Sequence, residues 1–273
     1  MPRLALALIL FLAALPAVAQ STLAAPHVKV SLISENASLQ PGKTAWVGLR
    51  FQLEKGWHVY WKNPGDSGEP PKIDWQLPAG WKAGDLQYPL PHRLPLQTLM
   101  NFGYENDVLY LVPLTVPAAA KGPASLVANI RWMVCENTCI PGKGKLTVSL
   151  PVASTAPQPG VQAQLIKDAR ARLPRNGGLR ATISSSNDSF VFRVTAPAKG
   201  AEFFPFDDLQ IENAAPQRFT GGAGSFQLAV KKSEQLAKLP LRIRGLLVLD
   251  GRRGYEVDLP VRPGTPPAKR PAK

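Results

Sequence analysis

The sequence predicts an all-β protein with two antiparallel β-sandwich domains, joined by a linker and one short helix. Two observations support this fold class. The chain contains 28 Pro and 22 Gly among 273 residues, and Pro removes a backbone donor and clashes with the preceding helical turn, so long helices are unfavourable. Short apolar runs also alternate with period two between turn residues, a pattern typical of immunoglobulin-like sandwiches.

The N-terminus has the features of a secretory signal peptide over residues 1–19. Arg3 supplies positive charge, the run from Leu4 to Pro16 is apolar, and Ala17-Val18-Ala19 forms an A-x-A cleavage site. The apolar run is shorter than the ~20 residues of a spanning helix, so an uncleaved anchor is the less favoured interpretation. We expect cleavage after Ala19 and export to the periplasm. At roughly 100–200 residues per domain, the remaining chain suggests two domains.

The first domain is expected over residues 26–152. Its strand candidates are short apolar or alternating runs bounded by Pro and Gly. They cover residues 27–32, 46–53, 108–114, 125–134 and 145–152. This spacing predicts the first sandwich.

A linker with a short helix is expected over residues 153–176. The sequence ASTAPQPG (153–160) is rich in Pro and small residues, which do not form a packed element. The sequence QAQLIKDARARL (162–173) predicts a helix that ends before Pro174 and Asn176-Gly177-Gly178.

The second domain is expected over residues 177–262. Strand candidates resume after the glycines and cover residues 180–184, 189–195, 225–231, 241–249 and 254–261. The Asp250-Gly251 pair between the last two predicts a tight hairpin. This half of the chain therefore predicts a second sandwich.

The chain is strongly basic, with a net charge of +13 and a pI of about 10.0. Export makes nucleic acid an unsuitable partner, and the basic residues are scattered except in the tail. The tail, residues 263–273 (PGTPPAKRPAK), is too polar and Pro-rich to pack, so we expect it to be disordered and solvated. Peripheral contact with an anionic membrane surface or an acidic partner is the alternative.

Both cysteines of the chain, Cys135 and Cys139, lie four residues apart. An exported protein most often uses such a pair as a structural disulfide. A closed loop of about five residues contributes roughly 2 kcal/mol in the chain-entropy model, against nearly 5 for about 100 residues. The pair is therefore poorly placed for stabilisation and well placed for disulfide exchange, which needs two adjacent thiols.

Geometry requires a turn between the two cysteines. Residues four apart in a strand are about 13 Å away from each other, whereas a disulfide needs Cα atoms within about 7 Å. We expect Cys135 to end one strand and Cys139 to begin the next, with Asn137 in a turn position that tolerates a left-handed conformation. Both sulfurs would then lie at the rim of the sandwich, within reach of a partner. Arg131 would favour a thiolate there and Glu136 would oppose it.

Three kinds of chemistry are open to this pair. Redox exchange ranks first, ahead of an inert structural disulfide in an adaptor protein. Metal binding is the third alternative, because Cu(I) prefers soft thiolate and thioether ligands. Met133 would join the cysteines in such a site, and Met100 is a further candidate. We expect no cofactor.

Three segments resemble the N-terminal domain of the thiol:disulfide interchange protein DsbD, closest to the branch called suppressor of copper sensitivity protein B. The first, Trp132 to Pro141, carries both cysteines. The second is GWHVYWKNPGDSG (56–68). The third comprises Tyr88 to Pro95 and Asn101 to Glu105, and it resembles the loop that covers the cysteines. The resemblance spans residues 26–152, and this branch also has a second immunoglobulin-like domain.

The resemblance implies a periplasmic thiol-disulfide oxidoreductase. It implies that Cys135 and Cys139 are the redox pair, with Cys139 attacking and Cys135 resolving. Phe102, Tyr104 and Glu105 would lie in the cap loop. The donor would be a membrane-embedded disulfide reductase, and the acceptors thioredoxin-like or disulfide isomerase proteins of the periplasm. The chain has no C-x-x-C motif, so we expect a free-standing form of the domain.

Other marked residues are expected around the pair. Trp132, Glu136, His58 and Tyr60 are the candidates for its surroundings. The aromatic set that includes Trp57, Trp75 and Trp81 is assigned mainly to packing. The Asn63–Gly68 segment is interpreted as a turn that could line the redox site, since it lacks the spacing of a phosphate loop.

Overall fold

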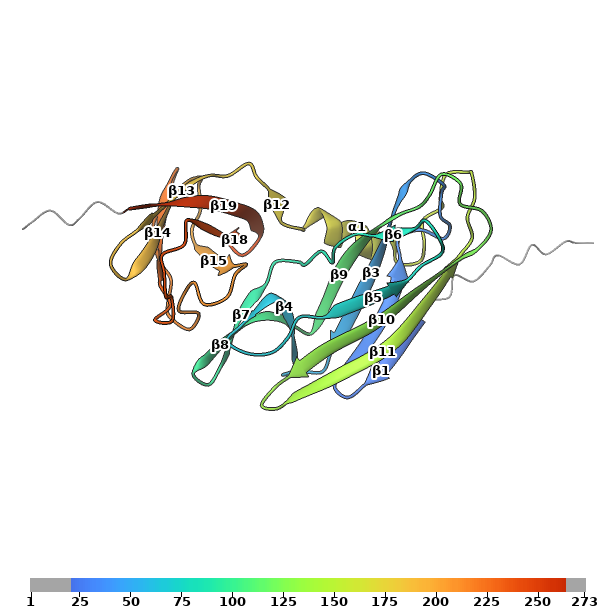
Figure 1. Cartoon of the computed structure of the whole chain (residues 1–273), viewed down its shortest axis with the longest axis horizontal. Helices are drawn as coiled ribbons and strands as arrows, with labels where there is room; N and C mark the ends of the chain where they lie inside the picture. Colours follow the sequence, from blue (N-terminus) through green and yellow to red (C-terminus); the bar gives the residue numbers. More distant parts are fainter. Residues whose placement is uncertain (1–20, 264–273) are drawn as a thin grey trace, which may run out of the picture.

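The computed structural model describes residues 21–263. The predicted signal peptide and all but the first residue of the predicted tail lie outside the described residues. The described chain is nearly all β, in antiparallel sheets with one helix, as predicted (Figure 1). The boundaries proposed for the domains remain a prediction.

Two sheets form the first sandwich. One has the order β1-β2-β3-β9-β6 and contains β1 (Ser21–Ala25), β2 (Val28–Ser34), β3 (Thr44–Leu53), β9 (Asp107–Thr115) and β6 (Lys82–Ala83). The other has the order β11-β10-β4-β8-β7, with β5 paired to β10, and contains β11 (Cys139–Leu150), β10 (Ala124–Cys135), β4 (His58–Gly65), β8 (Leu99–Glu105), β7 (His92–Leu96) and β5 (Lys72–Gln76).

The core of the first sandwich follows from the alternation of side chains. Along β10 every second residue from Leu126 to Val134 is buried, as period two requires of a strand with one face on a core. These side chains meet Val47, Leu49 and Phe51 of β3 in one hydrophobic cluster. The β10 face that points away from this cluster carries Cys135.

The second sandwich is built from strands in the order β15-β18-β19-β13-β14-β17-β16. They are β15 (Ala201–Pro205), β18 (Arg242–Leu249), β19 (Arg253–Pro263), β13 (Arg180–Ser185), β14 (Ser189–Thr195), β17 (Phe226–Lys231) and β16 (Arg218–Gly221), and β12 (Arg175–Asn176) pairs with β19. β19 pairs antiparallel with β18 and then parallel with the end of β13, so it passes from one layer to the other. The pairings of β19 with β12 and β13 are exceptions to the antiparallel prediction.

The predicted hairpin at Asp250-Gly251 is present between β18 and β19. Both residues have positive φ, 54° and 66°, as a type I′ turn requires. Asp250 also accepts hydrogen bonds from the backbone N–H groups of Lys199 and Gly200, which ties this turn to the preceding loop.

The predicted helix is α1 (Ala163–Ala171), and it packs against the first sandwich. Its Ile166 is buried with Ile33 and Leu111 on the outer face of the β3–β9 layer. The preceding segment 153–160 was predicted to be free of packed structure. Instead, backbone hydrogen bonds join it to residues 35–39, among them Ala37 N–H to Gln158 O at 2.9 Å and Gly160 N–H to Glu35 O at 2.8 Å.

The two sandwiches share a hydrophobic boundary at β15 and β18. Neighbouring residues in a strand point to opposite faces, so Phe203 enters the second core whereas Phe204 enters the first. The Phe204 ring lies 5.1 Å from Phe102 and 5.9 Å from Trp61, both in edge arrangements. The β15–β18 layer is therefore buried on both sides, beside β4 and β8 (Figure 1).

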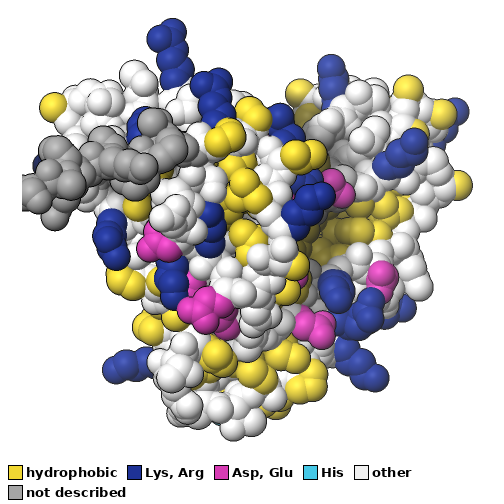
Figure 2. All heavy atoms as spheres, turned by 60° about the vertical axis from the view of Figure 1, so that its left-hand side comes forward, with side chains coloured by type: hydrophobic (Ala, Val, Ile, Leu, Met, Phe, Trp, Pro, Cys, Tyr) yellow, Lys and Arg dark blue, Asp and Glu magenta, His cyan; other side chains and the backbone are white. Residues whose placement is uncertain are grey.

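The surface confirms the scattered charge seen in the sequence. Lys and Arg side chains are spread over the face shown in Figure 2 rather than gathered in one patch. No helix within residues 21–263 has the length and the hydrophobicity that a membrane crossing requires.

Candidate functional site

The cysteine pair closes the tip of the β10–β11 hairpin. Cys135 is the last residue of β10, Cys139 is the first of β11, and the two face each other in the register. They form a disulfide with a Cα–Cα distance of 4.2 Å. The predicted three-residue turn is therefore confirmed. The left-handed conformation considered for Asn137 is not used, because Asn137 is not among the described residues with positive φ.

The two sulfur atoms differ in accessibility. Cys139 is exposed, whereas Cys135 is completely buried. The expectation that both would be within reach of a partner is therefore wrong for Cys135. The cause is the second edge of β10, where Cys135 pairs with His58 of β4, so this cysteine lies inside the sheet rather than at its rim.

His58 and Tyr60 line the inner side of the disulfide. The Tyr60 hydroxyl lies 3.8 Å from Cys139 Sγ and 3.2 Å from His58 Nε2. Both side chains come from β4, and residues two apart in a strand share a face, so they lie in a row next to Cys135. The structure thus brings these two predicted residues next to the pair.

Asn101 and Ser67 complete a buried polar network around His58. The sequence placed both in segments expected near the site, but it singled out neither residue. The Asn101 Oδ1 atom accepts hydrogen bonds from Ser67 N–H at 3.2 Å and from Ser67 Oγ at 2.9 Å. Its Nδ2 atom is thereby directed to His58 Nε2, 3.5 Å away. An amide NH₂ donates, so Nε2 accepts and the proton of neutral His58 is on Nδ1.

Burial sets the ionisation of both ring side chains. Desolvation lowers the pKa of His58, because the charged imidazolium loses its hydration. Burial raises the pKa of Tyr60 to about 12, with a smaller opposing effect of the hydrogen bond with Ser67. At neutral pH the disulfide therefore has a neutral imidazole and a neutral phenol beside it. The single hydroxyl hydrogen of Tyr60 can form a hydrogen bond either with His58 Nε2 or, after reduction, with a thiolate at Cys139.

A turn that we call the roof segment, residues 63–68, covers Tyr60. Gly68 has φ +89°, and a Cβ atom placed there would lie 2.0 Å from Tyr60 Cζ, so the glycine rests directly on the ring. The roof segment is also attached to β8, because Asp66 Oδ2 accepts the Met100 N–H at 2.7 Å. The sequence identified this turn, but not its position over Tyr60.

The second sandwich holds the roof segment from the other side. Asn63 Nδ2 donates to Pro205 O at 3.0 Å, and Asn213 Nδ2 donates to Asp66 Oδ1 at 2.8 Å. Pro205 and Asn213 are each about 140 residues away in the sequence from the roof-segment residue that they contact. The surroundings of the disulfide are therefore built by both halves of the chain.

The prediction that Phe102, Tyr104 and Glu105 lie in a cap loop is wrong. All three belong to strand β8, and the first two are buried in the core of the first sandwich. Phe102 packs on Phe204, and the Tyr104 hydroxyl donates to Pro89 O at 2.8 Å. Glu105 is exposed at the strand end opposite His58.

Trp132 and Glu136 lie close to the pair in different ways. Trp132 is a core residue 6.0 Å from Phe51, and its indole covers Gly142, where a Cβ atom would be 2.3 Å from the ring. Glu136 is exposed in the turn. A Cβ atom at Gly56 would lie 2.6 Å from its carboxylate, so the turn contacts the loop before β4.

The residues considered for copper are only partly assembled. Met133 precedes Cys135 by two residues on the same face of β10, and it is half-buried. Within residues 21–263 no group of three or more His, Cys, Asp or Glu side chains is arranged to hold a metal ion. Met100 is half-buried at the start of β8.

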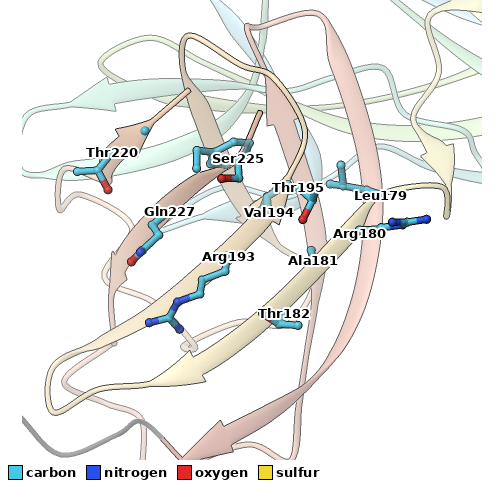
Figure 3. A pocket seen from close by; sticks show the side chains of 12 residues that line it. Leu179, Arg180, Ala181, Thr182, Arg193, Val194, Thr195, Thr220, Ser225 and Gln227 are labelled. Atoms are coloured by element: carbon cyan, nitrogen blue, oxygen red, sulfur yellow. The ribbon is translucent and has the colours of Figure 1, made fainter. Parts of the chain in front are cut away.

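A separate hollow of about 690 Å³ lies on the second sandwich, over strands β13, β14, β16 and β17 (Figure 3). Arg193, Thr182 and Gln227 project from these strands along it. Its lining contains no Cys, His, Asp or Glu side chain, so no general base lies beside its Ser and Thr hydroxyl groups to activate them as nucleophiles.

Comparison with known proteins places this geometry in a family. Residues 29–151 match the family model described as thiol:disulfide interchange protein DsbD, N-terminal. No curated protein sequence matches the chain. The crystal structure of the N-terminal periplasmic domain of ScsB from Proteus mirabilis aligns over 88% of this chain and 97% of its own, at 16% identity and a TM-score of 0.67.

At this identity the ScsB likeness establishes a shared fold, and it extends beyond the family match into the second sandwich. Domains 5-6 of the S-layer protein SbsC align over 90% of this chain and 100% of their own at 11% identity, but their TM-score of 0.24 supports no argument. Residues 29–151 therefore form a domain that matches the family described as thiol:disulfide interchange protein DsbD, N-terminal.

Proposed function

We propose that this protein transfers electrons by thiol-disulfide exchange through Cys135 and Cys139, acting on proteins of the periplasm. The observation that carries the proposal is the asymmetry of the pair. Cys139 is exposed next to the Tyr60 hydroxyl, whereas Cys135 is buried behind it. An attacking thiol must be accessible to the partner and partly ionised. A resolving thiol needs only to contact the sulfur of the attacking cysteine.

The exchange runs in two steps. The Cys139 thiolate attacks one sulfur of a partner disulfide, forms a mixed disulfide and releases the other partner sulfur as a thiolate. The Cys135 thiolate then attacks Cys139 Sγ, restores the Cys135–Cys139 disulfide and releases the second partner sulfur. The partner disulfide gains two electrons and two protons, and this protein loses them.

A donor must reduce the pair again. A membrane-embedded disulfide reductase fits this role, and thioredoxin-like or disulfide isomerase proteins of the periplasm fit the role of acceptor. The family match of residues 29–151 and the predicted signal peptide support this assignment.

The reduction potential of the pair tests the proposal. Glutathione equilibration of the full-length mature protein is expected to give a value between about −180 and −270 mV, the range of working exchange proteins. A value well below about −300 mV is typical of structural bridges and would favour an inert disulfide in an adaptor.

Two cysteine variants test the assigned roles. Cys135→Ala is expected to trap mixed disulfides with oxidised partners, because nothing then releases Cys139. Cys139→Ala is expected to trap none, because Cys135 is buried. Equal trapping by both variants would contradict the assignment of Cys139 as the attacking thiol.

Copper binding is the alternative, supported by Met133 on the same face as Cys135. Titration of the reduced protein with Cu(I), against a Cys135→Ser/Cys139→Ser control, separates the two functions. Tight 1:1 binding in a protein that exchanges no disulfides would favour copper.

A further inference from the structure

The outer face of the β10–β11 hairpin carries a line of side chains that begins at the disulfide. The register pairs Cys135 with Cys139, Met133 with Pro141, and Arg131 with Lys143. Residues two apart in a strand share a face, so the three pairs follow one another on one side of the hairpin. The distance from Cys139 to Lys143 is about 13 Å, the length of roughly four extended residues.

A groove of about 380 Å³ follows this line. Its apolar lining comes from Met133, Pro141, Trp132 and Pro70, and its edges carry cationic side chains. The complete lining is Glu69, Pro70, Lys72, Arg131, Trp132, Met133, Pro141, Gly142 and Lys143. The residues that follow the roof segment form its second wall, so the groove runs between that wall and the hairpin.

The charge of the groove is positive. Three cationic side chains and one acidic side chain line it, which leaves a net charge of +2. Lys72 lies 3.6 Å from Glu69, and Arg131 lies 3.3 Å from Asp74, in exposed pairs that contribute little. Within residues 21–263, Lys143 has no carboxylate within 4.0 Å.

We propose that this groove binds the polypeptide segment next to the reactive cysteine of the partner, and that it selects segments with an apolar residue followed by acidic residues. The inference rests on the proposed function. A mixed disulfide joins the partner to Cys139 by one S–S bond of about 2 Å, so the neighbouring residues of the partner must lie on the adjacent surface. The roof segment covers Tyr60, which lies beside Cys139, and the groove begins two residues along the hairpin from the disulfide, at Met133 and Pro141.

Charge complementarity selects the occupant. Lys143 and Arg131 are placed where the second to fourth residue beyond the partner cysteine would lie, and opposite charges increase the rate of encounter more than they increase affinity. The selectivity should therefore appear in the second-order rate constant and weaken with salt, since the Debye length falls from about 10 Å at 0.1 M to about 3 Å at 1 M.

Three synthetic peptides test the groove. Each carries one cysteine as a 2-thiopyridyl disulfide, followed by Leu and then by two Asp, two Ser or two Lys residues. The reduced full-length mature protein is mixed with each, and release of thiopyridone gives the rate constant. At low salt the Asp peptide is expected to react about tenfold faster than the Lys peptide, with the Ser peptide between them, and 1 M NaCl should remove most of the difference.

Three charge-reversal variants locate the effect. Lys143→Glu is expected to abolish or invert the preference among the three peptides. Lys121→Glu is the matched control, because Lys121 is exposed in the loop at the opposite end of β10, roughly 36 Å from the tip. It should keep the preference of the wild-type protein. Arg131→Glu provides a second reversal in the groove if Lys143→Glu does not fold.

The outcomes separate the two proposals. Equal rates for all three peptides, or a preference that Lys143→Glu and Arg131→Glu leave intact, would overturn the groove while the exchange function stands. Failure of the protein to react with any peptide would overturn the exchange function, and the groove inference with it.

Discussion

Replacement of Tyr60 by Phe tests whether the hydroxyl beside the disulfide controls the reactivity of Cys139. The change removes the only Tyr60 atom within hydrogen-bonding reach of Cys139 Sγ, 3.8 Å away, and leaves the ring under Gly68. Hydrogen bonds to charged groups contribute about 1.5–3 kcal/mol. The distance is at the long end for sulfur, so we take about 1.5 kcal/mol, equivalent to a roughly tenfold smaller thiolate fraction where the thiol is mostly protonated.

The rate should change by less than the thiolate fraction. A more basic thiolate is intrinsically more nucleophilic, with a Brønsted coefficient of about 0.4–0.5. One pKa unit therefore increases the rate constant of the thiolate by a factor of about three. Tyr60→Phe is therefore expected to react about threefold more slowly at low pH and about threefold faster where both proteins are fully ionised. The two pH–rate profiles should cross.

Alkylation by iodoacetamide measures this directly. Both proteins carry Cys135→Ala, so only Cys139 reacts, and the rate is followed by mass spectrometry from pH 5 to pH 10. The midpoint of the profile should move up by about one pH unit in Tyr60→Phe. Tyr255→Phe, in the second sandwich, is the control and should not move it. Superimposable profiles for Tyr60→Phe would show that the hydroxyl does not stabilise the thiolate.

Three further predictions concern stability and the roof segment. Burial lowers the pKa of His58, so from about pH 6.5 downward the unfolded chain binds a proton before the folded protein does. The free energy of unfolding should therefore fall on acidification, by up to about 1.4 kcal/mol per pH unit. Urea unfolding of His58→Gln should lack this contribution. Gly68→Ala displaces the Tyr60 ring and should shift the alkylation profile of Cys139 as Tyr60→Phe does. Phe204→Ala should lower the free energy of unfolding by about 3–5 kcal/mol, measured in the same urea assay, because the ring is fully buried between the two sandwiches.

Each of these has a matched control. His92→Gln removes an exposed histidine and should keep the acid dependence of the wild-type protein. Gly122→Ala has a similar positive φ of +68° but nothing within 4 Å, so it carries the backbone cost of Gly68→Ala without the contact. Leu241→Ala removes a side chain that is 87% exposed and should change stability little. A control that behaved like its test variant would refute the corresponding prediction.

Local patterns in the sequence predicted the local features well. The Asp250-Gly251 turn and the strand ends at Cys135 and Cys139 follow from backbone geometry over a few residues. The mistaken cap loop also has a local cause, since Phe102 and Tyr104 alternate with smaller residues as a buried strand does. The cap-loop prediction followed the family resemblance, whereas the alternation of side chains in this segment indicates a strand.

The long-range features could not be predicted from such patterns. Burial of Cys135 depends on a pairing with His58, 77 residues earlier in the chain by their numbers. The neighbours Phe203 and Phe204 look alike in the sequence, yet they enter different cores, because the layer that contains them is covered on both sides. The contacts of Asn213 and Pro205 with the roof segment likewise join residues that no local pattern connects.

The placement of the disulfide at the end of a fully paired hairpin has a consequence for turnover. The β10–β11 ladder pairs every residue from Ala124 with Leu150 to Cys135 with Cys139. Reduction of the disulfide therefore leaves the two strands paired in the same register. The oxidised and reduced proteins then present nearly the same shape. On the proposed exchange function, a partner would therefore distinguish them by the state of the sulfur atoms, and electron transfer would need no conformational cycle.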